Sequence, residues 1–442
     1  MTPGARYAAA IDILDAIEAG QQPADQIMSL WFREHRFAGS KDRMAIGELT
    51  YGVLRRRGQL DWWLTQYGLK ATSRLRVITA LALINKTPSD SLQEQWSLGS
   101  HAPSPLTASE KNLLDAMNEH ELLSADQPAW VRGNYPQWLD PLLRQAFPTE
   151  IDNEIAALNT EASVDLRVNT LKSDVSHATK ALEAEGLNPQ PMPYSPIGLR
   201  LAQRAAITAT AAFRDGLIEV QDEGSQLAAM LVAGKPGLAV LDLCAGAGGK
   251  TLALAAMMQN KGRLVATDLS AARLTRAKHR LRRAGVHVAE CRALDSSNEK
   301  WLKRQKNKFD RVIVDAPCSG SGTWRRNPDR KWHFTPEELD RLTKVQSALI
   351  AQGARAVKSG GRLIYAVCSF LNEEGPDRVH EFLKLNQEFE ILSGSSVWRE
   401  TVRVPYPKDD PFLRLSPGAN NTDGFFIAIL KRKETLNAAP LA

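Results

Sequence analysis

The sequence has few cysteines and lacks any long apolar run. Only four of its 442 residues are cysteine, and none of the four belongs to a C-x-x-C pair. A disulfide scaffold would need more cysteines, and a zinc site would need closely spaced ones. No run approaches the roughly 20 apolar residues that cross a bilayer, and the N-terminus has no signal-peptide core. We therefore expect a cytoplasmic protein with free thiols, no metal and no membrane contact.

The chain is mildly basic, with 56 lysines and arginines against 50 aspartates and glutamates and a net charge of +6. This balance is compatible with a polyanionic partner such as RNA, but many globular proteins have it without binding nucleic acid. The hydrophobic content of 43% is that of a globular protein, and the length suffices for two or three domains. The sequence does not specify the oligomeric state, and we favour a monomer.

The first part of the chain carries a helical pattern. Apolar residues from Tyr7 to Ile17 follow the spacing of one helix face, and Gly20 ends the run. Three similar patterns follow before residue 85, and no strand signal interrupts them. Residues 86–110, with three prolines and several serines, predict a loop or linker. We expect an independent all-α domain over residues 1–130.

The rest of the chain changes to an α/β pattern. Residues 131–212 predict linker helices and then a small α/β unit, because residues 164–168 are strand-like and a helix is expected near 175–185. From residue 213 to 435, short apolar strands alternate with helices. Such alternation predicts a doubly wound, mostly parallel sheet with helices on both faces, which is a Rossmann-like fold.

A glycine-rich loop, residues 245–250, follows the first strand of this predicted sheet. It is not the dinucleotide fingerprint, because Thr251 stands where a third glycine is required. It is not a P-loop either, because only two residues separate Gly246 from Gly249. Asp268, at the end of the next strand, is placed to accept hydrogen bonds from ribose hydroxyls. A nucleoside cofactor without a pyrophosphate, S-adenosylmethionine, fits this pattern; an ordinary strand–helix turn is the alternative.

Two cysteines lie at the carboxyl ends of predicted parallel strands. Cys318 follows one such strand and Cys368 follows the next. Ligands of open α/β sheets bind just beyond these strand ends, and two thiols aimed at one crevice favour covalent chemistry. Free cysteines are otherwise often small buried hydrophobes, which is the interpretation favoured for Cys244 and Cys291. A cysteine protease would need a general-base histidine, and no histidine lies near either motif.

Paired thiols suit the transfer of a methyl group to carbon 5 of cytosine. That carbon is too weak a nucleophile to attack a sulfonium methyl group until a thiolate adds to carbon 6. One cysteine is required for this addition, and a second can assist release of the product. Asp315, three residues before Cys318, is placed to hydrogen-bond the edge of the cytosine.

Several stretches carry a family signature. They are L-D-L-C-A-G-A-G-G-K-T at 241–251, D-A-P-C-S-G-S-G from 315, V-C-S at 367–369, and E-L-T-Y-G-V-L-R at 48–55. The first three resemble motifs of the RNA cytosine-C5 methyltransferases. The fourth is similar to the NusB-like N-terminal extension of one branch of that family, the bacterial 16S rRNA enzymes of the Sun or Fmu type.

The resemblance implies a role for each thiol. Cys368 is implied as the nucleophile and Cys318 as the residue that helps to release the product, with Asp315 beside them. S-adenosylmethionine is the implied cofactor, and its contacts are implied for one loop and three aspartates: Cys244, Ala245, Gly246, Ala247, Gly248, Gly249, Lys250, Asp268, Asp295 and Asp315. The implied partner is RNA, either 16S rRNA or a small-subunit precursor.

Asp295 is placed to contact an adenine amine, although a helix cap or a solvated loop explains it equally well. Val367 stands where the family usually has threonine, and Gly246-Ala247 stands where many members carry proline. The loss of one hydroxyl before Cys368 is expected to change the polarity around that sulfur.

Basic residues flank the predicted site in two places. The helix 271–284 carries six of them, and the loop 324–332 combines four with two tryptophans, which suits phosphate contact and base stacking. We expect the loop to contact RNA, whereas a solvated face explains the helix equally well.

Two other functions stay open, namely the same chemistry on tRNA and a non-catalytic RNA-binding ribosome-assembly factor.

Overall fold

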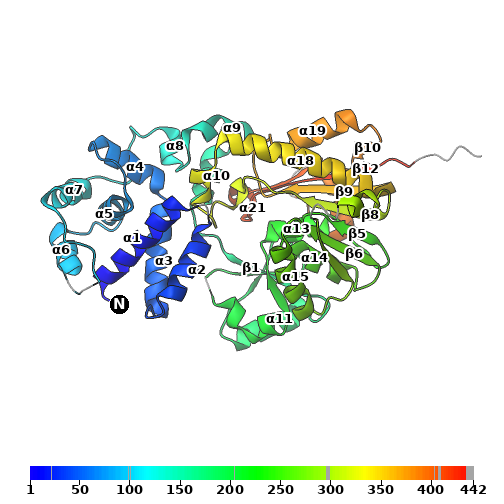
Figure 1. The fold of residues 1–442 in the computed structure, drawn as a ribbon, viewed down its shortest axis with the longest axis horizontal. Helices are drawn as coiled ribbons and strands as arrows, with labels where there is room; N and C mark the ends of the chain where they lie inside the picture. Colours follow the sequence, from blue (N-terminus) through cyan, green and yellow to red (C-terminus); the bar gives the residue numbers. More distant parts are fainter. Residues whose placement is uncertain are drawn as a thin grey trace, which may run out of the picture. The chain divides into compact units, whose positions relative to one another are not determined.

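The computed structural model describes residues 1–20, 22–97, 99, 101–203, 205–294, 299–402, 404–406 and 410–434 (Figure 1). The chain divides into two compact units, one of Met1–Glu161 with Thr323–Thr335 and the other of Ala162–Gly322 with Pro336–Ala442. In the described ranges, no helix is both long and apolar enough to span a membrane.

The first unit is helical. Its elements are α1 (Pro3–Ala19), α2 (Ala24–Glu34), α3 (Ser40–Leu54), α4 (Arg57–Gln66), α5 (Ser73–Leu83), α6 (Ser89–Ser97), α7 (Ala108–Asn118), α8 (Ala129–Arg132), η1 (Gln137–Leu139), α9 (Asp140–Ala146), α10 (Ile151–Leu158) and α17 (Arg330–His333). Thr2 begins α1 by accepting a hydrogen bond from the Ala5 amide at 3.2 Å, and Pro3 fits the first turn, which needs no N–H. Apolar helix faces form one core that extends from Ile13 of α1 to Leu114 of α7.

The predicted loop at 86–110 is partly wrong, because it contains α6. Leu92 and Trp96, one helical turn apart, are both buried in the core of the first unit. The prolines lie outside this helix, and Pro88 directly precedes its first residue. Burial of one apolar face therefore outweighs the prolines and serines of the segment.

The unit boundaries differ from the predicted domain limits. The helices α8 to α10 belong to the first unit, although the prediction ended the helical domain at residue 130. The small predicted α/β subdomain is grouped with the larger sheet in the second unit. The division into domains 1–130, 131–212 and 213–435 stays a prediction.

A small sheet opens the second unit. Its elements are β1 (Val164–Val168), α11 (Val175–Ala184), β2 (Gln190–Pro191), β3 (Gly198–Leu201), η2 (Ile207–Ala209), α12 (Ala211–Arg214) and β4 (Ile218–Val220). In the described part of the chain, the four strands are antiparallel in the order β2-β3-β1-β4. The strand predicted at 164–168 and the helix predicted near 175–185 are confirmed.

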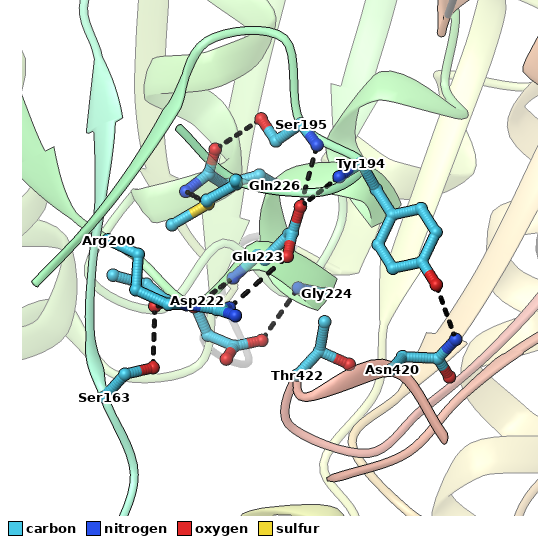
Figure 2. A network of polar contacts seen from close by, with 12 residues as sticks. Ser163, Tyr194, Ser195, Arg200, Asp222, Glu223, Gly224, Gln226, Asn420 and Thr422 are labelled. Atoms are coloured by element: carbon cyan, nitrogen blue, oxygen red, sulfur yellow. Dashed lines mark hydrogen bonds and ion pairs between the residues drawn. The ribbon is translucent and has the colours of Figure 1, made fainter. Parts of the chain in front are cut away.

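A buried polar network fixes this sheet to the helix α13 (Glu223–Met230). Figure 2 shows the Glu223 carboxylate accepting hydrogen bonds from the Tyr194 and Ser195 amides, at 2.7 and 2.8 Å. Arg200 of β3 pairs with Glu223 at 3.3 Å and with Asp165 of β1 at 2.7 Å. The Asp165 and Glu223 side chains are fully buried, so these paired charges fix the position of the sheet on the helix.

The rest of the second unit is a larger α/β layer structure. Its elements are β5 (Ala239–Asp242), α14 (Gly249–Met257), β6 (Arg263–Asp268), α15 (Ala271–Arg283), β7 (Ala289–Ala293), α16 (Glu299–Lys303), β8 (Phe309–Asp315), α18 (Pro336–Ala356), β9 (Val357–Val367), α19 (Pro376–Leu385), β10 (Phe389–Ile391), α20 (Gly394–Thr401), β11 (Leu413–Leu415), α21 (Pro417–Asn420) and β12 (Phe425–Arg432). The short η3 (Ser321–Thr323) crosses the boundary between the two units.

The predicted mostly parallel sheet is confirmed. Its strand order is β10-β12-β9-β8-β5-β6-β7, and β11 also pairs with β12, which makes eight strands in the described ranges. The strands from β7 to β9 in this order are parallel, whereas β10, β11 and β12 pair antiparallel. The helix α18 packs on β8 and β9, while α14 and α15 pack at β6 (Figure 1). The chain order reverses between β5 and β8, and the carboxyl ends there form the expected ligand crevice.

Candidate active site

The loop between β5 and α14 is shaped by two glycines. Gly246 and Gly248 have φ angles of +55° and +83°, which side-chain-bearing residues rarely adopt. Asp268, at the end of β6, accepts a hydrogen bond from the Gly246 amide at 2.9 Å. Its second oxygen accepts from the Ser270 amide at 2.7 Å. The carboxylate predicted to contact a ribose therefore also fixes the loop beside it.

A cavity of 1230 Å³ opens at these strand ends. Its lining includes most of the predicted cofactor residues, namely Cys244, Ala245, Gly246, Ala247, Gly249, Lys250, Asp268 and Asp315. Gly248 is not part of the lining, and Asp295 lies outside the described residues. Leu269 also lines the cavity and is 82% exposed, so an apolar surface lies next to the Asp268 carboxylate. The lining thus combines apolar walls with polar and charged side chains that could orient a small molecule.

The two predicted thiols meet beside this cavity. The Cys318 and Cys368 sulfurs are 3.3 Å apart, although 50 residues separate them in the chain. The hydrogen bond with Cys368, followed by burial, raises the pKa of the Cys318 thiol. Cys318 therefore keeps its proton, and either sulfur can be the donor of the hydrogen bond between them. In the described ranges, no group of three or more His, Cys, Asp or Glu is arranged to hold a metal ion.

Backbone bonds between the ends of β8 and β9 bring the thiols together. The Ala316 amide donates to the Ala366 carbonyl at 2.9 Å, which extends the ladder past the end of β8. The Gly322 amide donates to the Cys368 carbonyl at 3.0 Å. The relative position of the two cysteine loops is thus set by the sheet and by the turn that follows Cys318.

A partly buried ion pair lies near the thiols. Lys250, in the first turn of α14, bonds Asp315, the last residue of β8, with 2.6 Å between Nζ and Oδ2. Burial opposes the charge of Lys250, but the Asp315 carboxylate outweighs it and the pKa of Lys250 is raised; Cys368 contributes to the same effect. The ammonium therefore stays charged, and it brings a positive charge close to the two thiols. Asp315 is thus brought to the site, as predicted.

The other two cysteines do not join the pair. Cys244 follows β5 and lines the cavity, and burial raises its pKa. Cys291 lies on β7, which β6 and β5 separate from the thiol-bearing strands β8 and β9, and burial raises its pKa as well. A buried thiol that keeps its proton is a poor nucleophile, which agrees with the packing role predicted for both.

The basic helix 271–284, observed as α15, is split between two environments. Arg280 donates to the Ala247 carbonyl at 2.8 Å and pairs with Glu219 of β4 at 3.0 Å. Arg283 pairs with the same carboxylate. Four other basic residues of the helix are exposed: Arg273, Arg276, Lys278 and Arg282. Two of the six predicted RNA-facing residues thus support the cofactor loop and the small sheet instead.

The expected RNA contact by the loop 324–332 is wrong for three of its six predicted residues, and it stays a prediction for the exposed Arg330 and the partly exposed Arg326 and Trp332. The loop belongs to the first unit, where Trp324, Arg325 and Lys331 are each at most 2% exposed. Lys331 donates to the Asn159 side chain at 3.1 Å, and the Arg55 guanidinium donates to the Arg325 carbonyl at 3.1 Å. These side chains are internal to the helical unit, so they are not available to stack bases or contact phosphates.

Comparison with known proteins identifies relatives of this chain. Residues 229–431 match the family described as 16S rRNA methyltransferase RsmB/F, and residues 135–208 match the ferredoxin-like domain of RsmF/B-like methyltransferases. The Ribosomal RNA small subunit methyltransferase B of Escherichia coli (strain SMS-3-5 / SECEC) is 28% identical over 440 residues, which are 97% of this chain and 98% of that protein.

Two solved structures share the fold. The crystal structure of PH0851 is 26% identical and covers 98% of this chain and 99% of its own, with a TM-score of 0.79. A methyltransferase homolog protein from Pyrococcus horikoshii is 28% identical and covers 69% of this chain and 97% of its own, with a TM-score of 0.59. The predicted resemblance, the α/β fold with a helical N-terminal region, and S-adenosylmethionine as the cofactor are thereby confirmed.

Proposed function

We propose that this chain, whose residues 229–431 match the family described as 16S rRNA methyltransferase RsmB/F, methylates carbon 5 of a cytosine in 16S rRNA. The observation that carries the proposal is the contact between the Cys318 and Cys368 sulfurs, 3.3 Å apart beside the cofactor cavity. Cytosine needs a sulfur nucleophile to become reactive at carbon 5, and a second thiol is useful only if the first must later be released.

The cavity suits S-adenosylmethionine by its chemistry. The Asp268 carboxylate lies where a ribose hydroxyl is expected, and the exposed Leu269 side chain offers an apolar surface to a planar base. The left-handed glycines let the loop backbone approach a ligand closely. When bound, this cofactor supplies an electrophilic methyl group.

We assign the steps on the cytosine to three side chains. Cys368 adds as a thiolate to carbon 6, and the electrons of the broken ring double bond make carbon 5 the attacking atom. Asp315 hydrogen-bonds the base edge and Lys250 holds that carboxylate in place. After transfer, the proton on carbon 5 passes to water, the electron pair of that bond restores the ring double bond, and the carbon–sulfur bond breaks to leave Cys368 as a thiolate. Cys318, protonated in the resting site, assists this release.

We further propose the domain roles that the sequence implies. Residues 1–130 would be a NusB-like domain that binds RNA or protein, residues 131–212 a small RNA-handling subdomain, and residues 213–435 the catalytic domain. The ferredoxin-like match over residues 135–208 supports the second assignment. The exposed basic residues of α15 support RNA contact by the catalytic domain.

Bisulfite sequencing of rRNA and tRNA from a deletion strain tests the substrate. We expect one cytosine of 16S rRNA to lose its protection and to regain it when the wild-type gene is restored. The gene should be restored from a plasmid, and the same plasmid carrying the Cys368→Ala gene serves as the control. Loss of a tRNA signal instead would identify a tRNA enzyme, and an unchanged pattern with defective subunit assembly would identify an assembly factor.

A further inference from the structure

The turn that follows β9 carries a buried glutamate, Glu374, which lies between the two cysteine loops. Its residue is 0% exposed. The carboxylate accepts hydrogen bonds from the Ser319 amide at 2.8 Å and from the Ser319 hydroxyl at 2.5 Å. It also accepts from the Ser369 hydroxyl at 2.5 Å. Ser319 directly follows Cys318 and Ser369 directly follows Cys368, so one carboxylate connects the residues next to both thiols.

One further bond reaches the carboxylate itself, and two others hold the backbone around it. Gln346 of α18 donates to Glu374 Oε1 at 3.0 Å and to the Pro317 carbonyl, also at 3.0 Å. The Tyr365 hydroxyl donates to the Glu374 backbone carbonyl at 2.5 Å. Glu374 therefore has no freedom to follow one loop away from the other. Hydrogen bonds that an ionised carboxylate accepts are stronger than those between neutral groups, and burial strengthens them further.

The cost of burying this charge indicates a purpose beyond packing. Among the ion pairs of the described ranges, none includes Glu374, so hydrogen bonds alone compensate the carboxylate. A buried carboxylate without a counter-ion is expensive, and well-packed apolar residues could join two loops at lower cost. Its negative charge also adds to the effects that raise the pKa of Cys318, which helps to keep the proton on that sulfur.

We propose that Glu374 is a positioning residue that sets the distance between the Cys318 and Cys368 sulfurs by bonding both serines. The inference rests on the proposed function, because it gives the thiol pair its use in adding to and leaving the cytosine. Glu374 is not part of the cofactor cavity lining and does not touch the sulfurs in the described contacts.

Glu374→Gln is the direct test, because it keeps the size but replaces one acceptor oxygen with a donor. Glu373→Gln is the matched control: it is the same substitution one residue earlier, and Glu373 Oε2 has no hydrogen-bond partner. Two readouts are needed on the full-length protein. One is the rate at which diamide links Cys318 to Cys368, measured by mass spectrometry of the linked peptides. In this reaction two thiols lose two hydrogens to form a disulfide, and the diazene becomes a hydrazine.

The second readout is single-turnover methylation of a 16S rRNA transcript with radiolabelled S-adenosylmethionine. For Glu374→Gln we expect disulfide formation to slow at least about tenfold and methylation about 100-fold, because reacting groups displaced by about 1 Å lose rates of this order. The dissociation constant for S-adenosylmethionine, from calorimetry, should stay within about twofold of wild type, since the cavity is untouched. Glu373→Gln should match wild type in all three measurements.

Folded Glu374→Gln with wild-type rates in both readouts would overturn the inference. If Glu374→Gln forms the disulfide slowly but the wild-type enzyme methylates no RNA cytosine, the positioning role is retained and the proposed function is refuted. If thermal unfolding shows that Glu374→Gln is not folded, the Ser319→Ala/Ser369→Ala double variant replaces it. Wild-type disulfide rates in that double variant would equally overturn the inference.

Discussion

Two regions of the molecule each bury a lysine, and their surroundings give them opposite properties. Lys250, in the active site, is 8% exposed and bonds Asp315 at 2.6 Å, and its pKa is raised. Lys331, in the segment 323–335 of the helical unit, is 1% exposed and bonds the neutral Asn159 side chain at 3.1 Å. Burial, together with the nearby Arg55 charge, lowers the pKa of Lys331 to about 7.

The difference shows what distinguishes a reactive site from a structural one. Both lysines belong to stretches that look functional, one in a glycine-rich loop and one in a basic, tryptophan-containing loop. Only Lys250 has a carboxylate that keeps it charged, and only Lys250 lies beside a nucleophile that its charge can stabilise. Lys331 fills the interior with its long apolar stem, and its pKa of about 7 leaves the amine only about half protonated at neutral pH.

The largest effect is expected from Lys250→Met. The substitution removes the charge next to Cys368 and releases Asp315, so we expect single-turnover methylation to fall about 100-fold or more. Affinity for S-adenosylmethionine should fall much less, because the rest of the cavity lining remains. Lys308→Met, an exposed lysine outside the cavity, is the control and should keep its activity. Equal activity of the two variants would remove Lys250 from the mechanism.

A smaller effect, on stability rather than activity, is expected from Lys331→Met. The folded protein binds the Lys331 proton only below about pH 7, whereas the unfolded chain binds it up to about pH 10.5. Between these limits the unfolding free energy of wild type should therefore rise with pH by roughly a few kcal/mol more than that of Lys331→Met. Urea denaturation of both proteins from pH 6 to pH 10 measures how the unfolding free energy depends on pH. The same pH dependence in both proteins would show that Lys331 is ion-paired or solvated.

The smallest effect is expected from the exposed face of α15. Arg276→Ala/Arg282→Ala should weaken binding of a 16S rRNA transcript by less than about tenfold and reduce the salt dependence by about two charges. The same number of alanines at Arg325 and Lys331 should leave the salt dependence unchanged, because those side chains are internal. Filter binding across salt concentrations distinguishes the two double variants. A reduced salt dependence for the variant with alanine at Arg325 and Lys331 would show that these side chains of the loop 324–332 do contact RNA.

The parts of the fold that sequence predicts are those set by local patterns. Alternating strands and helices, and cysteines just past strand ends, follow from apolar spacing and from the geometry of parallel sheets, so Cys318 and Cys368 could be paired in advance. Glu374 could not be found this way, because its donors lie on segments up to 55 residues away. The burial of Lys331 could not be predicted either, because its partner Asn159 lies more than 150 residues earlier in the chain.

The central claim is a transient bond between the Cys368 sulfur and a cytosine ring. It is tested most directly by incubating Cys318→Ala and Cys368→Ala with labelled 16S rRNA transcript and S-adenosylmethionine and running a denaturing gel. The account predicts a protein–RNA adduct for Cys318→Ala, which adds to the base but releases it poorly, and neither adduct nor methylation for Cys368→Ala. An adduct with Cys368→Ala, or normal turnover by that variant, would contradict it.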